Sequence, residues 1–295
     1  MWRISRKIIL YGSLTIIVFA AVIFAKDIQR KAAYFYATIG ADRGTDAADV
    51  QGLLATDFDQ EEGVVHERRS PNESGSRYWW LNSGGEFIVH DGIGSTVEGE
   101  LDRFSKWRIV YNISNAPDTD EGRHPQNLFR LISRSKWLDV RQEIRFRVTR
   151  DNISSSPNRN ESNGVVLMSR YVDENNLYYA GLRVDGAAVI KRKKNGAYET
   201  LAYKKVFEGT YDRESNPSLL PKLEWITMRS VTQTLSDGGV LIELWQQKDG
   251  EWEKIAEALD VSELAIRQTG HVGTRSDFMD VQFDDIRIEE MNFLF

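Results

Sequence analysis

From residue 78 onward the chain is a succession of short segments in which apolar and polar residues alternate. In EIRFRVT, for example, Ile144, Phe146 and Val148 are separated by arginines. Because successive side chains of a β-strand point to opposite faces, each such segment has one face for a core and one for solvent. A helical repeat does not produce this alternation, so the pattern limits this part of the chain to an all-β fold.

Turn dipeptides separate these segments. Asp185-Gly186, Asn195-Gly196 and Asp249-Gly250 are typical of two-residue hairpin loops. Many short strands at this spacing predict an antiparallel two-sheet sandwich of the jelly-roll type. Helix signals are weak in this region, and DVSELAIRQ (residues 260–268) is the best candidate for a short helix.

The N-terminus carries a different signal. A short basic tail, residues 1–7, precedes IILYGSLTIIVFAAVIFA, residues 8–25, which contains no charge. Eighteen residues of helix are roughly 27 Å long, close to the thickness of a bilayer core. We therefore expect a single N-terminal transmembrane helix that acts as a signal anchor. A cleaved signal peptide is the alternative, although its apolar region is usually shorter.

The next segment, residues 26–76, is expected to be a helical extension followed by an acidic stalk with little fixed structure. The stalk prediction rests on a composition rich in Asp, Glu, Gly and Ser. Residues 77–292 remain as the jelly-roll domain.

Composition excludes several classes of function. The net charge is −6, whereas nucleic-acid-binding proteins usually carry a basic balance, so no nucleic-acid partner is expected. The chain has no cysteine, which excludes disulfides, thiolate chemistry and cysteine-based zinc sites. Its four histidines are too far apart in sequence for a motif such as H-E-x-x-H.

Four stretches, in this order and spacing, resemble the concanavalin A-like lectin/glucanase superfamily of jelly rolls, the laminin G-like kind. Together they cover residues 78–291. The stretches are WWLNSGGEFIVHDG, NLYYAGLRVDGAAVIKRKKNGAYETLA, LEWITMRSV with GGVLIELWQQKDGEWEKIA, and GHVGTRSDFMDVQFDDIRIEE.

The resemblance implies a location and a range of functions. Such domains lie mostly outside the cytoplasm, so we favour a single-pass membrane protein with its jelly roll on the extracytoplasmic side. This orientation rests on the resemblance, because the cations on the two sides of residues 8–25 nearly balance. Secretion after cleavage is the lesser alternative. The superfamily includes carbohydrate-binding modules, glycoside hydrolases, polysaccharide lyases and adhesion domains, so the fold does not determine the function.

Catalytic motifs of the superfamily are incomplete here. The glucanase motif E-x-D-x-E is absent. RQEIRFR and YYAGLR look like two of the three lyase strands, but no Q-[IV]-H segment occurs, and His124 lies in a loop. We assign no catalytic residue and lean against an enzyme. A polysaccharide-degrading enzyme, more readily a lyase than a hydrolase, stays as the alternative, and a structural domain for protein contacts as the second.

A binding function fits the polar strand faces better. Arginines and a tyrosine on one sheet face can hold a sulfated or uronic glycan through bidentate contacts and ring stacking. The alternative is a solvated sheet face with no ligand, on which outward Arg and Thr are normal. The candidate ligand-binding residues are Arg145, Arg147, Arg170, Tyr179 and Arg183.

The run KRKK, residues 191–194, forms a basic hairpin with Lys204 and Lys205 on an acidic protein. It is a candidate contact for an anionic polymer or lipid headgroups. More often, such lysines protect the edge of a sheet.

The closing strand changes phase at Asp284-Asp285. Met279, Val281 and Phe283 alternate at odd positions, after which the apolar residues fall at even positions. A one-residue slip of this kind predicts a β-bulge. In the superfamily that the sequence resembles, this position often supplies a calcium ligand, which makes Asp284 a candidate ligand of a structural Ca²⁺ ion. The alternatives are a plain bulge with two solvated carboxylates, or an ion pair with Arg287.

Overall fold

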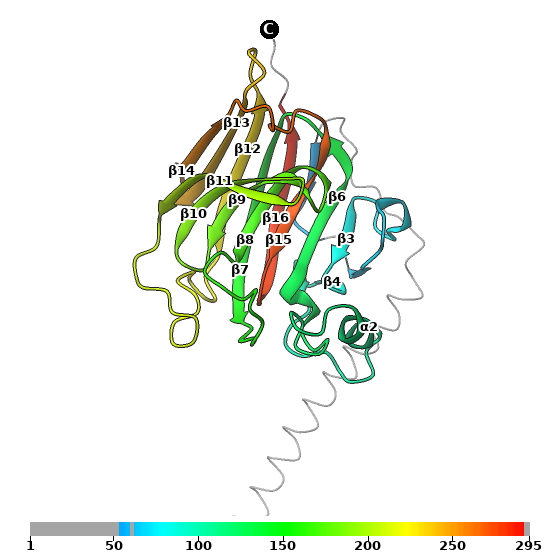
Figure 1. The fold of residues 1–295 in the computed structure, drawn as a ribbon. Helices are drawn as coiled ribbons and strands as arrows, with labels where there is room; N and C mark the ends of the chain where they lie inside the picture. The colour runs from blue at the N-terminus through cyan, green and yellow to red at the C-terminus, as the bar shows by residue number, and fades with distance from the viewer. Residues whose placement is uncertain (1–52, 60–61, 292–295) are drawn as a thin grey trace, which may run out of the picture. The chain divides into compact units, whose positions relative to one another are not determined.

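The computed structural model of the chain describes residues 53–59 and 62–291. They form two β-sheets whose neighbouring strands pair antiparallel (Figure 1). The larger of these, the large sheet, has nine strands within the described residues. Their order is β14 (Glu251–Asp260), β13 (Val240–Lys248), β12 (Ile226–Thr234), β7 (Val140–Asp151), β16 (Met279–Glu290), β5 (Ile93–Thr96), β4 (Glu86–His90) and β2 (Gly63–His66), with β1 (Leu53–Thr56) also paired to β16.

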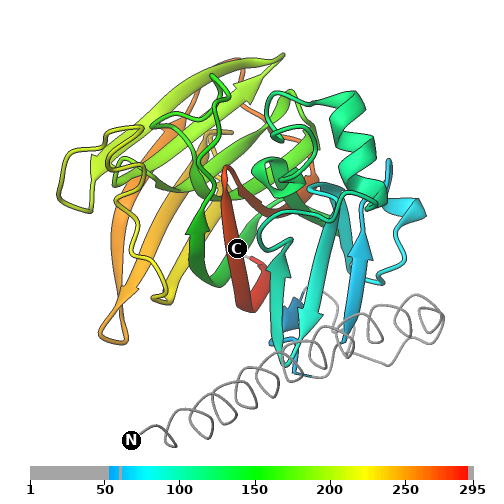
Figure 2. The ribbon, with the colours of Figure 1, turned by 90° about the horizontal axis from the view of Figure 1, so that it is seen from below.

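The second sheet, the small sheet, has seven strands among the described residues and packs against the first. Its β10 and β11 lie on one side of the sandwich and the large sheet's β13 and β14 on the other (Figure 2). The order is β11 (Ala197–Lys205), β10 (Ala187–Lys194), β9 (Asn176–Arg183), β8 (Gly164–Asp173), β15 (Gly270–Ser276), β6 (Phe129–Trp137) and β3 (Trp79–Ser83). The predicted antiparallel two-sheet sandwich is confirmed.

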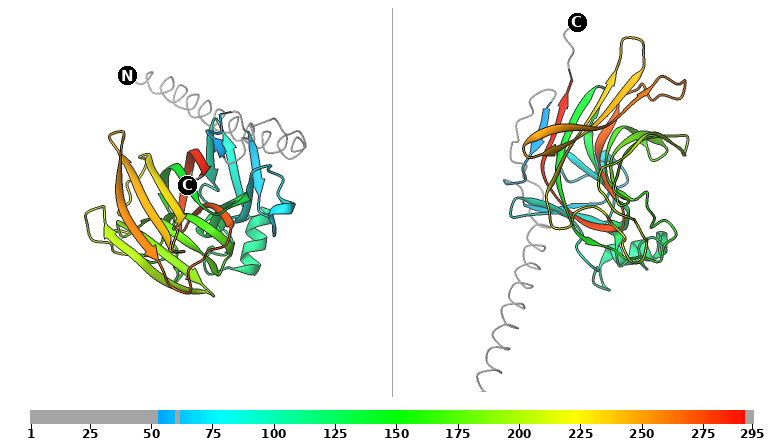
Figure 3. Two further views of the ribbon diagram at one scale, coloured as in Figure 1. Left: turned by 90° about the horizontal axis from the view of Figure 1, so that it is seen from above. Right: turned by 90° about the vertical axis from the view of Figure 1, so that its left-hand side faces the viewer.

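The core lies between the two layers, whose arrangement Figure 3 shows from above. In β7 the predicted alternation holds: Ile144, Phe146 and Val148 are buried in this core, and the arginines between them are half-exposed. Opposite them, Leu167 and Leu182 of the small sheet point into the same layer. Burying each large apolar side chain contributes about 1.5–3 kcal/mol, so the side chains that alternation directs inward stabilise the packing of the two sheets.

The phase change in β16 is a β-bulge. The pairing of β16 with β7 shifts between Asp284 and Arg287, and Asp285 has a φ of 47°. The extra residue returns Ile286 and Ile288 to the core face that Phe283 also occupies. The bulge predicted from the sequence is confirmed.

The expectation of little fixed structure before residue 77 is wrong for two segments. β1 pairs with β16, and Leu54 packs in the main core. β2 pairs with β4, and the buried ring of Phe58 lies 5.7 Å from that of Phe87. Strands of four residues bury few side chains, so a composition rich in acidic residues conceals them. β2 forms one edge of the large sheet, and β1 pairs along β16.

Helices are few among the described residues. They are α2 (Lys106–Ser114) and the short 3-10 segments η1 (Pro71–Glu73) and η2 (Pro125–Leu128). The predicted helix at residues 260–268 does not form, because Asp260 ends β14 and the following residues are a turn. The predicted span, residues 8–25, and most of the extension that follows lie outside the described residues. Within the described ranges, no helix has the length and apolarity that crossing a bilayer would require.

Candidate functional site

The five predicted ligand-binding residues do not meet on one face. Arg145 and Arg147 lie on the outer face of the large sheet, the face turned away from the core. Tyr179 and Arg183 lie on the outer face of the small sheet, and Arg170 lies in the interior. The assumption that these residues share a face is therefore wrong, because sequence alternation assigns a side to each strand but does not say which sheet the strand joins.

Arg170 is a structural residue. Its side chain is fully buried at a φ of 48°, and its guanidinium donates to Ile266 O at 2.6 Å, Thr234 Oγ1 at 2.7 Å and Asp139 Oδ1 at 3.0 Å. Burial lowers the pKa of Arg170 from its ordinary value, although Asp139 opposes the shift. These contacts tie β8 to the loop after β14, to the end of β12 and to the β6–β7 turn, and no part of the side chain is left for a ligand.

Arg145 and Arg147 belong to a ladder across the large sheet. Arg145 Nη1 lies 3.2 Å from Asp284 Oδ2, and Arg147 Nε donates to Gln282 Oε1 at 3.0 Å. Both guanidinium groups lie over the ring of Trp225, at 4.5 and 4.6 Å. Their donors are engaged by partners from the neighbouring strand, which makes this face a poor candidate for binding an anion.

Asp284 stays a predicted calcium ligand. Burial, followed by the charge of Asp285, raises the pKa of Asp284 despite the nearby Arg145. Among residues 53–59 and 62–291, three metal-type ligand atoms approach one another at the exposed group Glu62, His90 and Asp91, which does not include Asp284.

The outer face of the small sheet carries a different cluster. We name it the tyrosine–lysine strip and define it as Tyr179 (β9), Lys191 and Lys193 (β10), Tyr198 (β11) and Arg275 (β15). Alternation explains its membership: in KRKK the first and third residues point outward, and Arg192 between them points inward with 3% of its side chain exposed.

The strip is built around two stacked tyrosines. The rings of Tyr179 and Tyr198 lie 6.1 Å apart with an interplanar angle of 27°. Lys193 Nζ lies 4.7 Å from the centre of the Tyr198 ring, and Lys191 Nζ 6.0 Å from it. Arg275 Nη1 donates to the Tyr179 hydroxyl at 3.2 Å. The exposed ring of Tyr198 and the two ammonium groups thus lie together on one surface, with the buried ring of Tyr179 beneath them.

The strip has an excess of positive charge. Arg275 is paired with Asp277 at 2.7 Å, whereas neither Lys191 nor Lys193 has an ion-pair partner in the described part of the chain. Burial, followed by the charge of Arg183, lowers the pKa of Lys191. The sheet already excludes part of the water around the two ammonium groups. An anion beside Lys191 and Lys193 would therefore compensate for hydration that these groups lack.

The tyrosines have opposite titration behaviour. Burial raises the pKa of Tyr179 to about 12, so its hydroxyl stays protonated at neutral pH. Burial acts in the same direction on Tyr198, but Arg275 and Lys193 outweigh it and lower the pKa of Tyr198 below its ordinary value. The positive charges of Arg275 and Lys193 therefore stabilise the anionic form of Tyr198 relative to an ordinary tyrosine, and the same charges would attract a carboxylate or sulfate.

An apolar floor adjoins the strip on the same outer face. Tyr179 belongs to it, and every member is buried, although this face looks away from the main core. Trp80 Nε1 is satisfied by Arg68 O at 2.8 Å. The floor consists of Trp80, Ile132, Val166, Met168, Tyr171, Leu177 and Tyr179.

A buried polar cluster lies behind the strip, in the interior. Asp260 accepts hydrogen bonds from Arg192 Nη1 at 2.7 and 2.6 Å and from the Tyr178 hydroxyl at 2.7 Å. The Tyr178 hydroxyl in turn accepts from Ile266 N at 2.9 Å. Tyr178 and Arg192 are the chain neighbours of Tyr179, Lys191 and Lys193, so this cluster fixes the strands that carry the strip.

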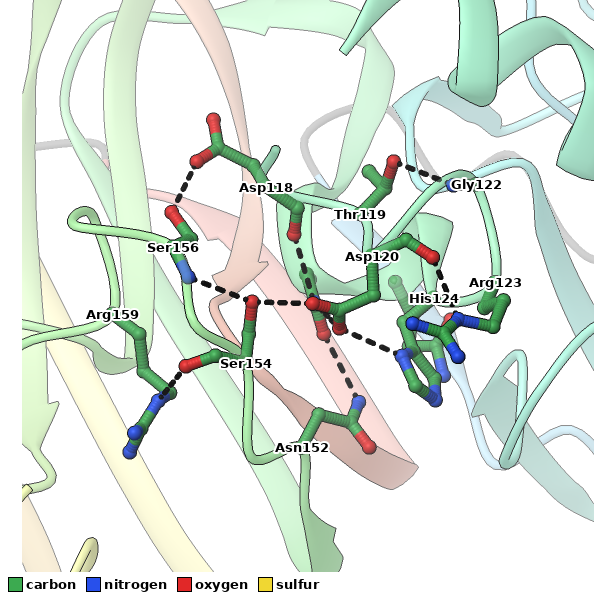
Figure 4. A network of polar contacts seen from close by, with 12 residues as sticks. Asp118, Thr119, Asp120, Gly122, Arg123, His124, Asn152, Ser154, Ser156 and Arg159 are labelled. Atoms are coloured by element: carbon green, nitrogen blue, oxygen red, sulfur yellow. Dashed lines mark hydrogen bonds and ion pairs between the residues drawn. The ribbon is translucent and has the colours of Figure 1, made fainter. Parts of the chain in front are cut away.

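His124, the only histidine with a suggested role in lyase chemistry, lies elsewhere. Its Nδ1 lies 2.9 Å from Asp120 Oδ2 (Figure 4). Its Nε2 lies 3.3 Å from Arg150 Nη2. Asp120 Oδ1 also accepts from Ser154 Oγ at 2.6 Å. Both ring nitrogens are thus used in a network that joins two loops, which leaves no free nitrogen to act as a base.

Asp118 belongs to the same network. Burial favours its neutral form, but hydrogen bonds from Ser156, Asn158 and Asn115 outweigh this and lower the pKa of Asp118. Asp280 is held similarly by Gln126, Asn152 and the Gly99 amide, each within 2.9 Å. These carboxylates are satisfied by amide and hydroxyl donors, so the network has a structural role.

No family model matches the chain, and no curated protein matches it. Among solved structures, the chain is similar to the carbohydrate-binding module CBM66 from Bacillus subtilis, with 12% identity, 72% of this chain and 95% of that chain covered, and a TM-score of 0.46. It is also similar to a mutant of the GH43 protein BlXynB from Bacillus licheniformis, with 13% identity, coverage of 85% and 41%, and a TM-score of 0.48. A third match is a beta-1,3-1,4-glucanase from a mouse hindgut metagenome, with 9% identity, coverage of 81% and 100%, and a TM-score of 0.44.

The chain spans less than half the length of the GH43 protein. Identities and TM-scores this low transfer no ligand and no activity to the chain. The sandwich implied by the sequence resemblance to concanavalin A-like jelly rolls is confirmed by the chain's own two sheets.

Proposed function

We propose that the chain binds an anionic polysaccharide across the outer face of the small sheet. The observation that carries this proposal is the stacked pair Tyr179 and Tyr198, flanked by Lys191 and Lys193, for which the described residues provide no carboxylate partner. This combination is more specific than either feature alone. Lysines that only protect an edge need no aromatic platform, and a purely structural tyrosine pair needs no unneutralised cations.

Each part of the strip has a chemical role in this proposal. The exposed ring of Tyr198 offers an apolar face to the ring of a sugar. Lys191 and Lys193 donate charge-assisted hydrogen bonds to the carboxylate of a uronic acid or to a sulfate ester. Arg275, oriented by Asp277, holds the Tyr179 hydroxyl and adds to the local positive field. A neutral glucan would use the rings but leave the cations unpaired.

The test is a panel of uronic, sulfated and neutral polysaccharides, offered to the full chain in non-ionic detergent. We expect binding to the anionic members only. In the double variant Lys191→Ala with Lys193→Ala, affinity should fall at least about tenfold, because each charge-assisted hydrogen bond contributes roughly 1.5–3 kcal/mol. Binding of neutral and anionic polymers alike would contradict the proposal.

A matched control removes the same charge from the other sheet. In Lys248→Ala with Lys254→Ala, both lysines lie on the large sheet and pair with glutamates. We expect this variant to bind like the wild type; an equal loss in both double variants would show that net charge, rather than the strip, determines binding. The lyase alternative is tested by following the ultraviolet absorbance of the wild-type chain mixed with the same polysaccharides. The appearance of unsaturated products would identify an enzyme.

We further propose that residues 8–25 anchor the chain in a membrane with the sandwich on the extracytoplasmic side. The support is the length of this uncharged segment and its basic flanks. After alkaline extraction of expressing cells, the intact chain should stay with the membranes. Recovery of a soluble chain that has lost these residues would instead establish a cleaved signal peptide.

A further inference from the structure

α2 is apolar on two opposite sides. Trp107 and Tyr111, one turn apart, are buried against the rest of the domain. The opposite side carries Ile109 and Ile113, with exposed fractions of 52% and 81%. At 3.6 residues per turn these two pairs face away from each other. A surface helix normally turns polar residues to solvent on this second side, so its apolar character calls for a partner.

The exposed side extends beyond these two residues. Val110 lies next to Ile113 on the same face, with 37% exposed, and Phe104, just before the helix, is 75% exposed. We name the set Phe104, Ile109, Val110 and Ile113 the α2 face. Figure 2 shows the helix at the periphery of the domain. Four large apolar side chains exposed within ten residues are unusual for a solvent-facing segment.

Cations outnumber carboxylates beside this face, where Asp102 directly precedes Arg103 and accepts from Phe104 N at 2.9 Å. Residues 103–114 contain Arg103, Lys106 and Arg108 and no Asp or Glu, in a chain whose net charge is −6. The Arg103 guanidinium lies 4.6 Å from the centre of the Phe104 ring, and Lys106 Nζ lies 4.8 Å from that of Trp107. The face is therefore an apolar patch with a positive rim, the pattern of helices that lie in the headgroup region of a bilayer.

We propose that the α2 face docks on an anionic lipid bilayer. A lipid surface matches both halves of the pattern, since acyl chains accept Phe104, Ile109 and Ile113 while acidic headgroups accept the basic rim. A protein groove would match the apolar half, but nothing in the face selects a protein over lipid, whereas the rim selects an anionic surface. The uncharged segment at residues 8–25 is a separate feature, and docking of α2 does not depend on the polysaccharide site.

The chain has no cysteine, so one introduced cysteine reports on one place. Ile113→Cys in the full chain, labelled with an environment-sensitive fluorophore, is mixed with vesicles of phosphatidylcholine and phosphatidylserine. We expect a blue shift and at least about twofold quenching by spin-labelled lipid. The matched control is Glu251→Cys, an exposed site on the β13–β14 hairpin that should show neither effect. Adding Arg103→Glu and Lys106→Glu should reduce the quenching at position 113 to near the control.

Three results would overturn the proposal. Absence of quenching at position 113 in anionic vesicles would exclude contact with lipid. A blue shift without quenching would show that a protein segment, from this chain or a second copy, covers the α2 face. Equal quenching in vesicles of phosphatidylcholine alone would exclude the selectivity for acidic headgroups. Thermal unfolding of each variant, with an unchanged midpoint, confirms that the fold is retained.

Discussion

Removal of one buried carboxylate, Asp260→Ala, should weaken the whole sandwich. The Asp260 side chain is 2% exposed and takes both contacts from Arg192 Nη1, at 2.7 and 2.6 Å, and the Tyr178 hydroxyl at 2.7 Å. The Arg192 side chain is only 3% exposed. Without Asp260, its remaining acidic partner is Glu199, whose side chain is more than half exposed. Leaving a buried charge without its partner costs about 3–5 kcal/mol.

Urea unfolding followed by circular dichroism measures this free energy. For a domain of this size, a loss of 3–5 kcal/mol also lowers the thermal midpoint by roughly 10 °C. Glu263→Ala, at an exposed site in the neighbouring turn, is the matched control and should unfold like the wild type. A second change, Arg192→Met, added to Asp260→Ala, should recover part of the loss, because no unpaired charge is then left in the core.

The loss should depend on pH. Burial favours the neutral form of Asp260, but hydrogen bonds from Ser262, Tyr178 and Arg192 outweigh it and lower the pKa of Asp260. A carboxyl whose pKa is lower in the folded chain stabilises the fold above its unfolded pKa of about 3.9, and this contribution disappears as the pH falls through the folded pKa. The difference between wild type and Asp260→Ala should therefore shrink below about pH 4. A cost under about 1 kcal/mol at neutral pH, or one that acid leaves unchanged, would refute the reasoning.

Three other changes test separate parts of the account. Burial lowers the pKa of His271, so the unfolded chain binds a proton at a higher pH than the folded chain does, and the wild type should lose stability as the pH falls from about 7 to 5. Urea unfolding of His271→Gln at these two pH values should show a smaller loss. An equal loss in the wild type and the variant would contradict this. Phe283→Ala removes a ring stacked 5.6 Å from that of Phe129 and should lower the free energy of unfolding by about 3–5 kcal/mol, whereas Phe104→Ala, at an exposed site, should cost under about 1 kcal/mol. If calcium binds at Asp284, an ion concentration 100-fold above Kd should stabilise the wild type by about 2.7 kcal/mol but leave Asp284→Ala unchanged, and equal midpoints with calcium and with chelator would remove the prediction.

Much of the fold is legible in local pattern. The alternation of Ile144, Phe146 and Val148 predicts the buried face of β7 because a pleated strand and its core have the same two-residue period. Asn195-Gly196 predicts the β10–β11 hairpin because both residues tolerate the positive φ angles, 51° and 82°, that the turn requires. The bulge at Asp284-Asp285 is also predictable, because one extra residue shifts the two-residue alternation of apolar side chains by one position.

Features that depend on distant partners were not predictable in this way. β1 and β2 are strands because β16 and β4 offer them free edges, and no local signal in four residues conveys this. The predicted helix at residues 260–268 fails because Asp260 is held in place by Arg192, which lies far away in the chain. α2 was missed because apolar residues on both sides of a short helix blur its period.

The candidate site was predicted in part. KRKK marked a basic hairpin, and its alternation separates Lys191 and Lys193 from the inward Arg192. The sequence predicts Tyr179 as a ligand-binding residue. Its stacking on Tyr198 and its contact with Arg275 join three strands whose neighbours in the sheet the sequence does not reveal. Arg170 was misjudged because its bulged, positive-φ backbone turns it inward against the local alternation.

The most direct test of the proposed function is a lysine footprint. The full chain in detergent is acetylated briefly with and without a polyuronate, and modification of each lysine is read by mass spectrometry. The account predicts that the polymer protects Lys191 and Lys193 by at least about threefold, and that Lys248 and Lys254 on the large sheet react equally in both samples. Unchanged reactivity of Lys191 and Lys193 at a polymer concentration that saturates binding would contradict it, because the ligand would then lie elsewhere.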